Sequence, residues 1–563
     1  MLIKKLHFNK ILAFFLLLVF VPCVKAQEKD PLVSAARVMS DEIKYSIANI
    51  KDKESPPLYF LLYRLALRET YSLRCSYGDI GFEEYSSEQI PFVEARVGTY
   101  EFDNTRNGFA SKADWGTASL EFSSTTIRHI FWYLTDIAYK RAVKKYWDKK
   151  AELVGHPEEE ELPDFSKEEP QQAVLGLDKM PKLDKDLLMR LCRTSSREFL
   201  KYPEIDFGLT SVSFRSEAWV MVNSEGAMII EDARHTPYSF RIYAEAQADD
   251  GLEVSSYRQK HSRDPSGLPD PEEIKKFMAV VAEEVKDLKN APQGTPSVAP
   301  VLVDGEATGV LFHEALGHHL EGRRQREKFE LQTFKGKLGE KILPDFISLA
   351  SNPLIKKYKN AEIAGHYTHD SEGVPAREIS LVKNGILENY LVSRRPISGF
   401  MRSNGSARSD AASLSEGRMS VIIIDSNAPL KDADLKNRFL EVLKEKKHKF
   451  GFRIVGMDSG ETYTSRGQSQ SFVGRPRLVY MVKANGRETL VRGMEFVGTP
   501  LMAVKGIIAA GKNMSVKNAF CGAGSGWVPV THIAPPVIIS SLELQKQPED
   551  RFKPPLIKAP IFR

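Results

Sequence analysis

The sequence predicts an α+β protein, in which a mixed α/β N-terminal domain precedes a β-rich C-terminal domain with one embedded helix. At 563 residues the chain is too long for one ordinary core, so two or three domains are expected. Its composition, 42% hydrophobic and 27% charged, is typical of a globular protein. Helical and strand periods alternate in the first half, whereas the two-residue strand period dominates after about residue 300.

The first 26 residues have the pattern of a secretory signal peptide. Three lysines precede an apolar run at residues 11–21, and small residues lead up to Ala26. The run is too short to span a bilayer comfortably and no second one follows it, so no transmembrane anchor is expected in the mature chain. Cys23 would suit a lipoprotein anchor, but Pro22 fits such a site poorly. We therefore expect cleavage near Ala26 and a periplasmic or extracellular protein.

Cleavage would remove four lysines and no acidic residue, which lowers the formal net charge from +5 to +1. The remaining basic residues are interleaved with acidic ones, so no nucleic-acid binding is expected. Three cysteines remain, an odd number for an exported protein. A disulfide between Cys75 and Cys192 with Cys521 as a thiolate fits this count, but the sequence does not establish the pairing.

The N-terminal domain is predicted at residues 27–289. The sequence predicts a helix at 58–69, strands around 71–75 and 92–100, and an amphipathic helix at 127–147. An acidic segment at 155–170 is interpreted as a solvated loop.

Further along this domain, strands are expected within residues 207–247, with a hairpin turn at 223–226. Asp270 and Pro271 then cap a helix whose apolar face extends from Ile274 to Leu288. The proline-containing segment 290–300 is the predicted linker.

The β-rich domain is predicted at residues 301–547, followed by a tail at 548–563. Asn384-Gly385 and Asn485-Gly486 are flanked by apolar strands and predict hairpins. The remaining predicted elements are a strand at 301–303, the embedded helix at 309–322, a buried strand at 419–424, and helices at 434–446 and 501–510.

The embedded helix carries the motif H-E-x-x-x-H. His313 and His318 are five positions apart, about 140° around a regular helix, so they do not share one face. Both can reach one ion only if the helix takes up an extra residue, as a single-turn π-bulge does. Gly317 tolerates that distortion and permits close approach of another backbone or a substrate. Two histidines alone do not distinguish a metal site from core residues.

This helix, residues 312–322, resembles the H-E-x-x-x-H helix of the TldD/PmbA family of metallopeptidases. Cys521-Gly522, followed by a Val-Pro-Val strand, resembles the family's C-terminal Cys-Gly segment. Residues 370–375, the hairpin at 384–385 and residues 402–413 follow in the family's order. The resemblance covers about residues 295–545, and the N-terminal half only loosely. It implies an N-terminal α/β domain and a barrel-like C-terminal metallopeptidase domain.

The resemblance also implies one Zn²⁺ per chain, held by His313, His318 and Cys521, with Glu314 as the catalytic carboxylate. Three protein ligands leave a position for a water that the metal activates. Glu314 would act as general base towards that water. Glu321 is a candidate for orienting a ligating imidazole, although a surface acid is nearly as good an interpretation. For Cys521 the alternatives are a disulfide partner, a buried thiol or a nucleophile.

Three further histidines are weaker candidates. His319 follows a predicted ligand, and we expect it at the surface or in support of the site. His366 and His369 lie near Asp370 and Glu372, where we favour an active-site loop without metal over a second metal cluster.

These features predict a zinc-dependent endopeptidase that acts on unfolded or extended polypeptides, added as a strand to an exposed sheet edge. The resemblance implies a homodimer, or a heterodimer with a related subunit that lacks the metal helix. Two alternatives stay open: a non-catalytic peptide-binding partner subunit with a structural metal, and a metal-dependent hydrolase of non-peptide amides.

Overall fold

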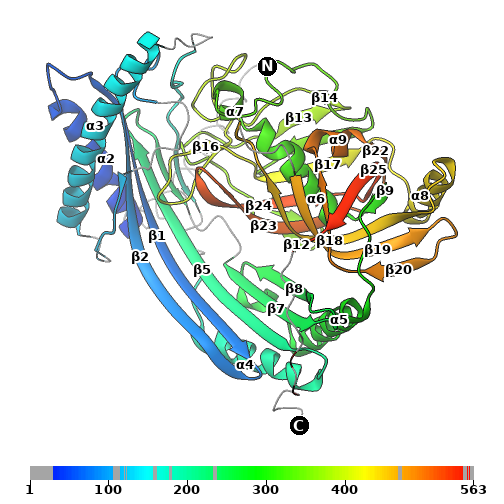
Figure 1. Ribbon diagram of the computed structural model, residues 1–563. Coiled ribbons are helices and arrows are strands. Elements are labelled where there is room, and N and C mark those ends of the chain that lie inside the picture. Colours follow the sequence, from blue (N-terminus) through cyan, green and yellow to red (C-terminus); the bar gives the residue numbers. More distant parts are fainter. Residues whose placement is uncertain are drawn as a thin grey trace, which may run out of the picture.

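Long antiparallel strands dominate the N-terminal half of the computed structural model (Figure 1). The structure describes residues 30–105, 114–119, 121, 123–155, 162–175, 181–231, 237–466, 472–548, 555 and 557. The predicted signal peptide and almost all of the predicted tail lie outside these residues. The first sheet has the order β3-β2-β1-β5-β6-β4, with β7 paired to β5 and β8 to β7. Its strands are β1 (Leu58–Ser76), β2 (Asp79–Val97), β3 (Asp114–Trp115), β4 (Gln172–Leu175), β5 (Phe207–Asn223), β6 (Met228–Glu231), β7 (Tyr238–Gln247) and β8 (Glu253–Ser262).

Helices cover this sheet in two groups. α2 (Pro31–Asn49) and α3 (Ser124–Gly155) pack on one part of it through a core that includes Phe131 and Val220. α4 (Lys185–Arg197) and α5 (Pro271–Asn290) pack on another part around Phe240 and Met278. Two short 3-10 turns follow α4 and precede α5, η2 (Glu198–Lys201) and η3 (Pro265–Gly267).

The helix predicted at residues 58–69 is wrong, because this segment is the first part of β1. β1 lies between β2 and β5 and is buried on both faces over most of this stretch. A strand of that kind is continuously apolar, so its periodicity does not separate it from a buried helix. α2 and α4 were not predicted.

Other N-terminal predictions are confirmed. α3 contains the predicted helix at 127–147, and β5, β6 and β7 occupy the predicted strand region. The turn at 223–226 joins β5 to β6, with Gly226 at φ 104°. Asp270 caps α5 by accepting a hydrogen bond from the backbone N–H of Glu273 at 2.8 Å.

The solvated-loop interpretation of residues 155–170 is wrong for residues 164–166, which are buried. Residues 156–161 lie outside the described residues, but Asp164 is buried and forms ion pairs with Lys149 and Arg326. Phe165 is buried beside Phe60. The acidic composition of this segment did not indicate that it packs between the two halves of the chain.

The C-terminal half contains a closed barrel and a six-stranded sheet. Five strands close the barrel in the order β18-β9-β25-β21-β19, because β19 also pairs with β18. The fold class is therefore as predicted, a mixed α/β chain with a barrel in its C-terminal region. The barrel strands are β9 (Ser297–Val303), β18 (Phe450–Thr462), β19 (Phe472–Lys483), β21 (Met494–Gly498) and β25 (Val537–Lys546), with β20 (Glu488–Val491) and β22 (Ile507–Ala510) appended.

The six-stranded sheet has the order β14-β13-β10-β17-β24-β23, so that β23 is an edge strand. Its strands are β10 (Ile347–Ser351), β13 (Ile379–Lys383), β14 (Ile386–Leu387), β17 (Val421–Ser426), β23 (Ser515–Ala523) and β24 (Gly526–Ala534). Two small pairs accompany it, β11 (Lys357–Tyr358) with β12 (Ala361–Glu362), and β15 (Ala407–Arg408) with β16 (Glu416–Gly417).

Both predicted hairpins and the buried strand are confirmed in this half. The hairpins join β13 to β14 and β19 to β20, and the buried strand is β17. The predicted linker is wrong after residue 296, because β9 begins at Ser297. Pro300 lies within β9 next to a register shift, where the missing backbone N–H of proline is tolerated. α8 (Asp432–Glu445) is confirmed. The helix predicted at 501–510 ends early, since α9 (Pro500–Lys505) is followed by β22.

Cys75 on β1 and Cys192 on α4 form a disulfide, with their Cα atoms 5.7 Å apart, and Cys521 is free and buried. Among the helices of the described residues, none is long and apolar enough to cross a membrane.

Candidate metal centre

The helix that carries the two motif histidines changes its winding at the first of them. Asp304 caps the N-terminus of α6 (Gly305–Phe312), since its carboxylate accepts a hydrogen bond from the Ala307 N–H at 2.8 Å. A π turn, η4 (His313–Gly317), follows, and a 3-10 turn, η5 (His318–Leu320), ends the helix. The predicted π-bulge is confirmed. Its extra residue brings the rings of His313 and His318 to a centroid separation of 4.9 Å.

Glycine is required at two positions of this helix by close packing. A Cβ on Gly317 would overlap the sulfur of the buried Met419. A Cβ on Gly309 would lie 2.5 Å from the Cβ of His532. The helix is thus pressed between the strand region before β17 and strand β24.

A hairpin brings Cys521 to the histidines. β23 and β24 pair in a register that places Cys521 opposite Val528, with a tight turn at residues 524 and 525. The Cys521 Sγ lies 3.1 Å from His313 Nε2 and 3.4 Å from His318 Nε2. The three side chains are buried, and their donor atoms lie within 4.8 Å of one another. The structure therefore brings Cys521 to two histidines that lie more than 200 positions earlier in the sequence.

The second nitrogen of each imidazole is held by another side chain. His318 Nδ1 lies 2.9 Å from a carboxylate oxygen of Glu321, and His313 Nδ1 lies 2.9 Å from Nε2 of His532. Each Nε2 is left to face the sulfur. Metal-bound histidines commonly use their other ring nitrogen in this way, because the hydrogen bond fixes tautomer and ring orientation. Two imidazole nitrogens and one thiolate are also the donors that zinc prefers, so this set fits zinc.

His532 was not among the predicted site residues. Burial, together with the charges of His313 and Lys517, lowers its pKa well below the ordinary value. A neutral His532 can accept the N–H of His313 Nδ1. The strand period could have indicated His532 as a site residue. It lies on the same face of β24 as Val528, the residue opposite Cys521.

Charge in this cluster favours the thiolate. Burial alone raises the pKa of Cys521, but the adjacent charges and hydrogen bonds of His313 and His318 lower it well below the ordinary value. Burial lowers the pKa of His318, whereas Cys521 and Glu321 raise it to about 10. Both shifts favour a protonated His318 beside a deprotonated Cys521 when no metal is bound. Because zinc requires a neutral imidazole, metal binding would displace the His318 proton.

Glu314 lies in the π turn, buried and next to His313. Burial raises its pKa, while the charges of His313 and His318 lower it. Gly460 of β18 packs against its side chain, and a Cβ there would approach the Glu314 Cγ to 2.7 Å. A buried carboxylate with a raised pKa beside the imidazoles is suited to accept and return a proton.

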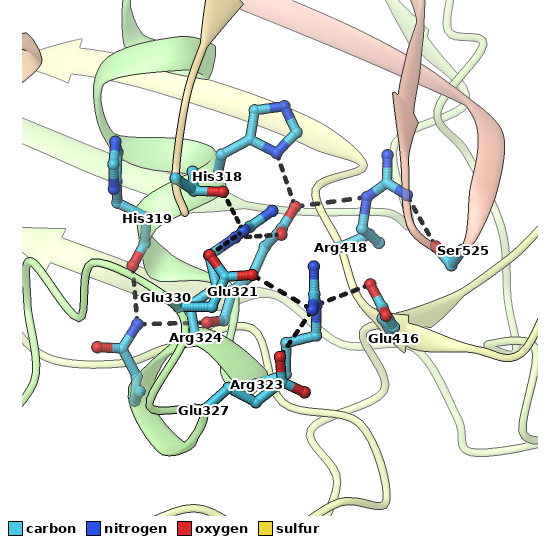
Figure 2. Close-up of polar contacts among 12 residues, drawn as sticks. His318, His319, Glu321, Arg323, Arg324, Glu327, Glu330, Glu416, Arg418 and Ser525 are labelled. Atoms are coloured by element: carbon cyan, nitrogen blue, oxygen red, sulfur yellow. Dashed lines mark hydrogen bonds and ion pairs between the residues drawn. The ribbon is translucent and has the colours of Figure 1, made fainter. Parts of the chain in front are cut away.

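Glu321 belongs to a buried ionic network (Figure 2). Its side chain is fully buried, and Arg324 donates to it at 2.9 Å. Arg418 forms an ion pair with it at 3.4 Å. Burial raises the pKa of Glu321, but Arg324, His318 and Arg418 outweigh burial and lower it below its ordinary range. The surface-acid alternative for Glu321 is therefore wrong, and the carboxylate is held charged next to His318.

The three weaker histidine candidates, His319, His366 and His369, are not part of the cluster. His319 is buried, which excludes the surface alternative, and burial with Arg324 and His318 lowers its pKa to about 4. His366 Nδ1 lies 2.8 Å from the carbonyl oxygen of Pro353. In the described part of the chain, no second group of three metal-binding side chains occurs around His366 and His369.

Residues 296–546 match the family model of the PmbA/TldA metallopeptidase C-terminal domain. The chain belongs to the TldD/PmbA family. Among curated relatives, a metalloprotease of Archaeoglobus fulgidus is 27% identical over 258 residues, which are 46% of this chain and 56% of that protein. The chain therefore spans little more than half the length of this relative.

Two further TldD/PmbA proteins extend the comparison. A zinc metalloprotease TldD homolog of Saccharolobus solfataricus is 23% identical over 329 residues, 57% of this chain and 67% of the relative. The crystal structure of TldE from Thermococcus kodakarensis has a TM-score of 0.60 at 15% identity, and the match covers 90% of this chain and 99% of TldE. The structural match shows that the fold of the TldD/PmbA family extends over both halves of the chain.

Proposed function

We propose that this protein is a zinc-dependent endopeptidase that cleaves unfolded or extended polypeptides. The convergence of His313, His318 and Cys521 on one point, with Glu314 beside them, is the observation that supports this most strongly. Family relatives described as metalloproteases, one of them as a zinc metalloprotease, agree with it.

One Zn²⁺ bound by these three side chains would supply the Lewis acidity that polarises a peptide carbonyl and activates water. Glu314 accepts the proton of the attacking water and returns it to the leaving amine. Glu321 and His532 hold the second nitrogens of His318 and His313 and so fix both ring orientations.

Exposed sheet edges near the candidate metal centre support the proposed class of substrate, an unfolded or extended polypeptide. Cys521 lies on β23, an edge strand of the six-stranded sheet. A cleft of about 570 Å³ separates the first residues of β23 from β8, which is an edge of the N-terminal sheet. An extended peptide bound along such an edge uses main-chain hydrogen bonds and makes few demands on side chains. Folded proteins would be poor substrates, because their backbone donors and acceptors are already paired.

Glu314→Gln tests the proposal. The variant should bind zinc as the wild type does but lose ~10²–10⁴-fold in the rate of cleavage of a denatured, dye-labelled polypeptide, because proton transfer is lost. Glu441→Gln, at an exposed acid of α8, is the matched control and should retain full activity. Near-normal turnover of zinc-loaded Glu314→Gln would remove Glu314 from the mechanism. Cleavage of cell-wall fragments but not of polypeptides would favour a non-peptide amide hydrolase.

We further propose that the protein is exported and acts as a homodimer or as the catalytic partner of a related subunit. The N-terminal signal pattern supports export, and the likeness to TldE supports related subunits. N-terminal sequencing of the exported fraction should begin near Gln27, and an intact Met1 in a cytosolic pool would contradict export. Light scattering of the native protein, isolated with any co-purifying subunit, measures the assembly.

A further inference from the structure

Arg418 is a fully buried arginine between β16 and β17 that contacts two parts of the candidate metal centre at once. Its Nη2 donates to Cys521 Sγ at 3.1 Å and to the Cys521 carbonyl oxygen at 3.0 Å. Its Nη1 donates to Ser525 Oγ at 2.7 Å, in the turn of the same hairpin. Its Nε lies 3.4 Å from Glu321 Oε1, the oxygen that faces His318 Nδ1 (Figure 2).

One guanidinium therefore touches the sulfur of one candidate ligand and the carboxylate that orients another. Cys521 is on the β23–β24 hairpin, whereas His318 and Glu321 are at the end of the helix, about 200 residues earlier. Besides the candidate ligand His318 itself, Arg418 is thus a side chain that contacts both Cys521 Sγ and Glu321.

We propose that Arg418 is a positioning residue that couples the two ligand-bearing elements, so that the thiolate of Cys521 and the imidazole of His318 are aligned together. The inference rests on the proposed zinc site. It assigns Arg418 two effects: it fixes the hairpin relative to the helix, and its N–H group draws electron density from the thiolate. The second effect makes the sulfur a weaker donor and leaves a bound metal more electrophilic.

Arginine suits this position better than lysine would. The planar guanidinium presents several N–H groups in fixed directions, which matches a sulfur, a carbonyl, a hydroxyl and a carboxylate at different angles. A lysine ammonium at the same place carries the charge, but its single nitrogen cannot reach the hairpin turn and Glu321 together. The charge itself is compensated by Cys521, Glu321 and Glu416, which together raise the pKa of Arg418 against the effect of burial.

Cobalt(II) titration of the whole protein tests the proposal, since cobalt replaces zinc and its thiolate-to-metal charge-transfer band reports on the sulfur. Arg418→Lys should weaken cobalt and zinc binding by ~10–100-fold, the usual cost of losing a group that orients a ligand. The charge-transfer band should also move to longer wavelength, because a thiolate without its hydrogen bond releases charge more easily. Arg394→Lys is the matched control, because it replaces another buried arginine whose guanidinium donates to Ser166 and Glu225; its band and affinity should equal those of the wild type.

The outcomes separate the proposal from the proposed function. Folded Arg418→Lys with wild-type affinity and an unshifted band would overturn the coupling role. If Arg418→Lys does not fold, Ser525→Ala decides: it removes one anchor of the guanidinium and should produce a smaller shift in the same direction, whereas no shift overturns the proposal. Wild-type protein that binds neither cobalt nor zinc would overturn the proposed function, and this inference with it.

Discussion

Gly317→Ala adds one methyl group inside the π turn, at a point where the structure has no room for it. The new Cβ would overlap the sulfur of Met419 and lie 3.0 Å from its terminal methyl. Met419 is fully buried, so its side chain cannot move into solvent. Inserting a methyl into a packed core typically costs ~1–3 kcal/mol, and alanine recovers ~0.5–1 kcal/mol of backbone entropy relative to glycine. The net destabilisation should be ~1–2 kcal/mol.

Urea unfolding of the metal-free protein and zinc affinity together measure the effect. Because the overlap pushes the π turn away from Met419, zinc affinity should fall along with stability. Met419→Val removes the overlapping atoms, so adding Gly317→Ala in that background should cost less than it does alone. Gly155→Ala is the control, since nothing lies within 4 Å of that position. Equal costs of Gly317→Ala in both backgrounds would refute the packing argument.

Three other substitutions probe the site and its surroundings. Cys521→Ser should lower zinc affinity sharply, and bound zinc should protect the wild-type thiol from alkylation; free alkylation in a metal-loaded, active enzyme would exclude Cys521 as a ligand. His532→Ala should lower zinc affinity ~10–100-fold, measured by chelator competition, and unchanged affinity would contradict its hold on His313. Glu372→Gln should flatten the pH dependence of stability. Burial, together with Asp370 and Glu94, raises the pKa of Glu372 to about 8. Between about pH 4.5 and 8 the folded wild type therefore holds a proton that the unfolded chain releases, so its stability falls as pH rises through that window. If the free energy of unfolding changes equally with pH in wild type and variant between pH 5 and 9, the expectation for Glu372 is refuted.

The local chemistry of the helix could be predicted because its constraint lies within six residues. Two histidines five positions apart and a glycine before the second are sufficient to require an extra residue in one turn, and the structure contains that π turn. The turn signals at 223–226, 384–385 and 485–486 succeeded for the same reason.

The failures have a common physical cause, which is tertiary context. Residues 58–69 are apolar on both sides because β1 is central in its sheet, and only the neighbouring strands reveal this. The sequence predicts Asp164 in a solvated acidic loop, whereas in the structure it is buried between Lys149 and Arg326. Arg418 carries no local signal at all, since its partners are 97 and 103 positions away in the chain.

The two halves of the chain are joined at the metal centre through the hairpin that carries Cys521. Arg64 of β1 is fully buried and donates at 2.8 Å to Ser409 Oγ and to the carbonyl oxygen of Ser413. Between these residues, Asp410 donates its backbone N–H to the carbonyl oxygen of Ser525 at 3.0 Å. The N-terminal sheet thus supports the loop that holds the hairpin turn from one side, while Arg418 holds it from the other. Because the helix fixes only two of the three candidate ligands, the position of the third depends on contacts from both halves of the protein.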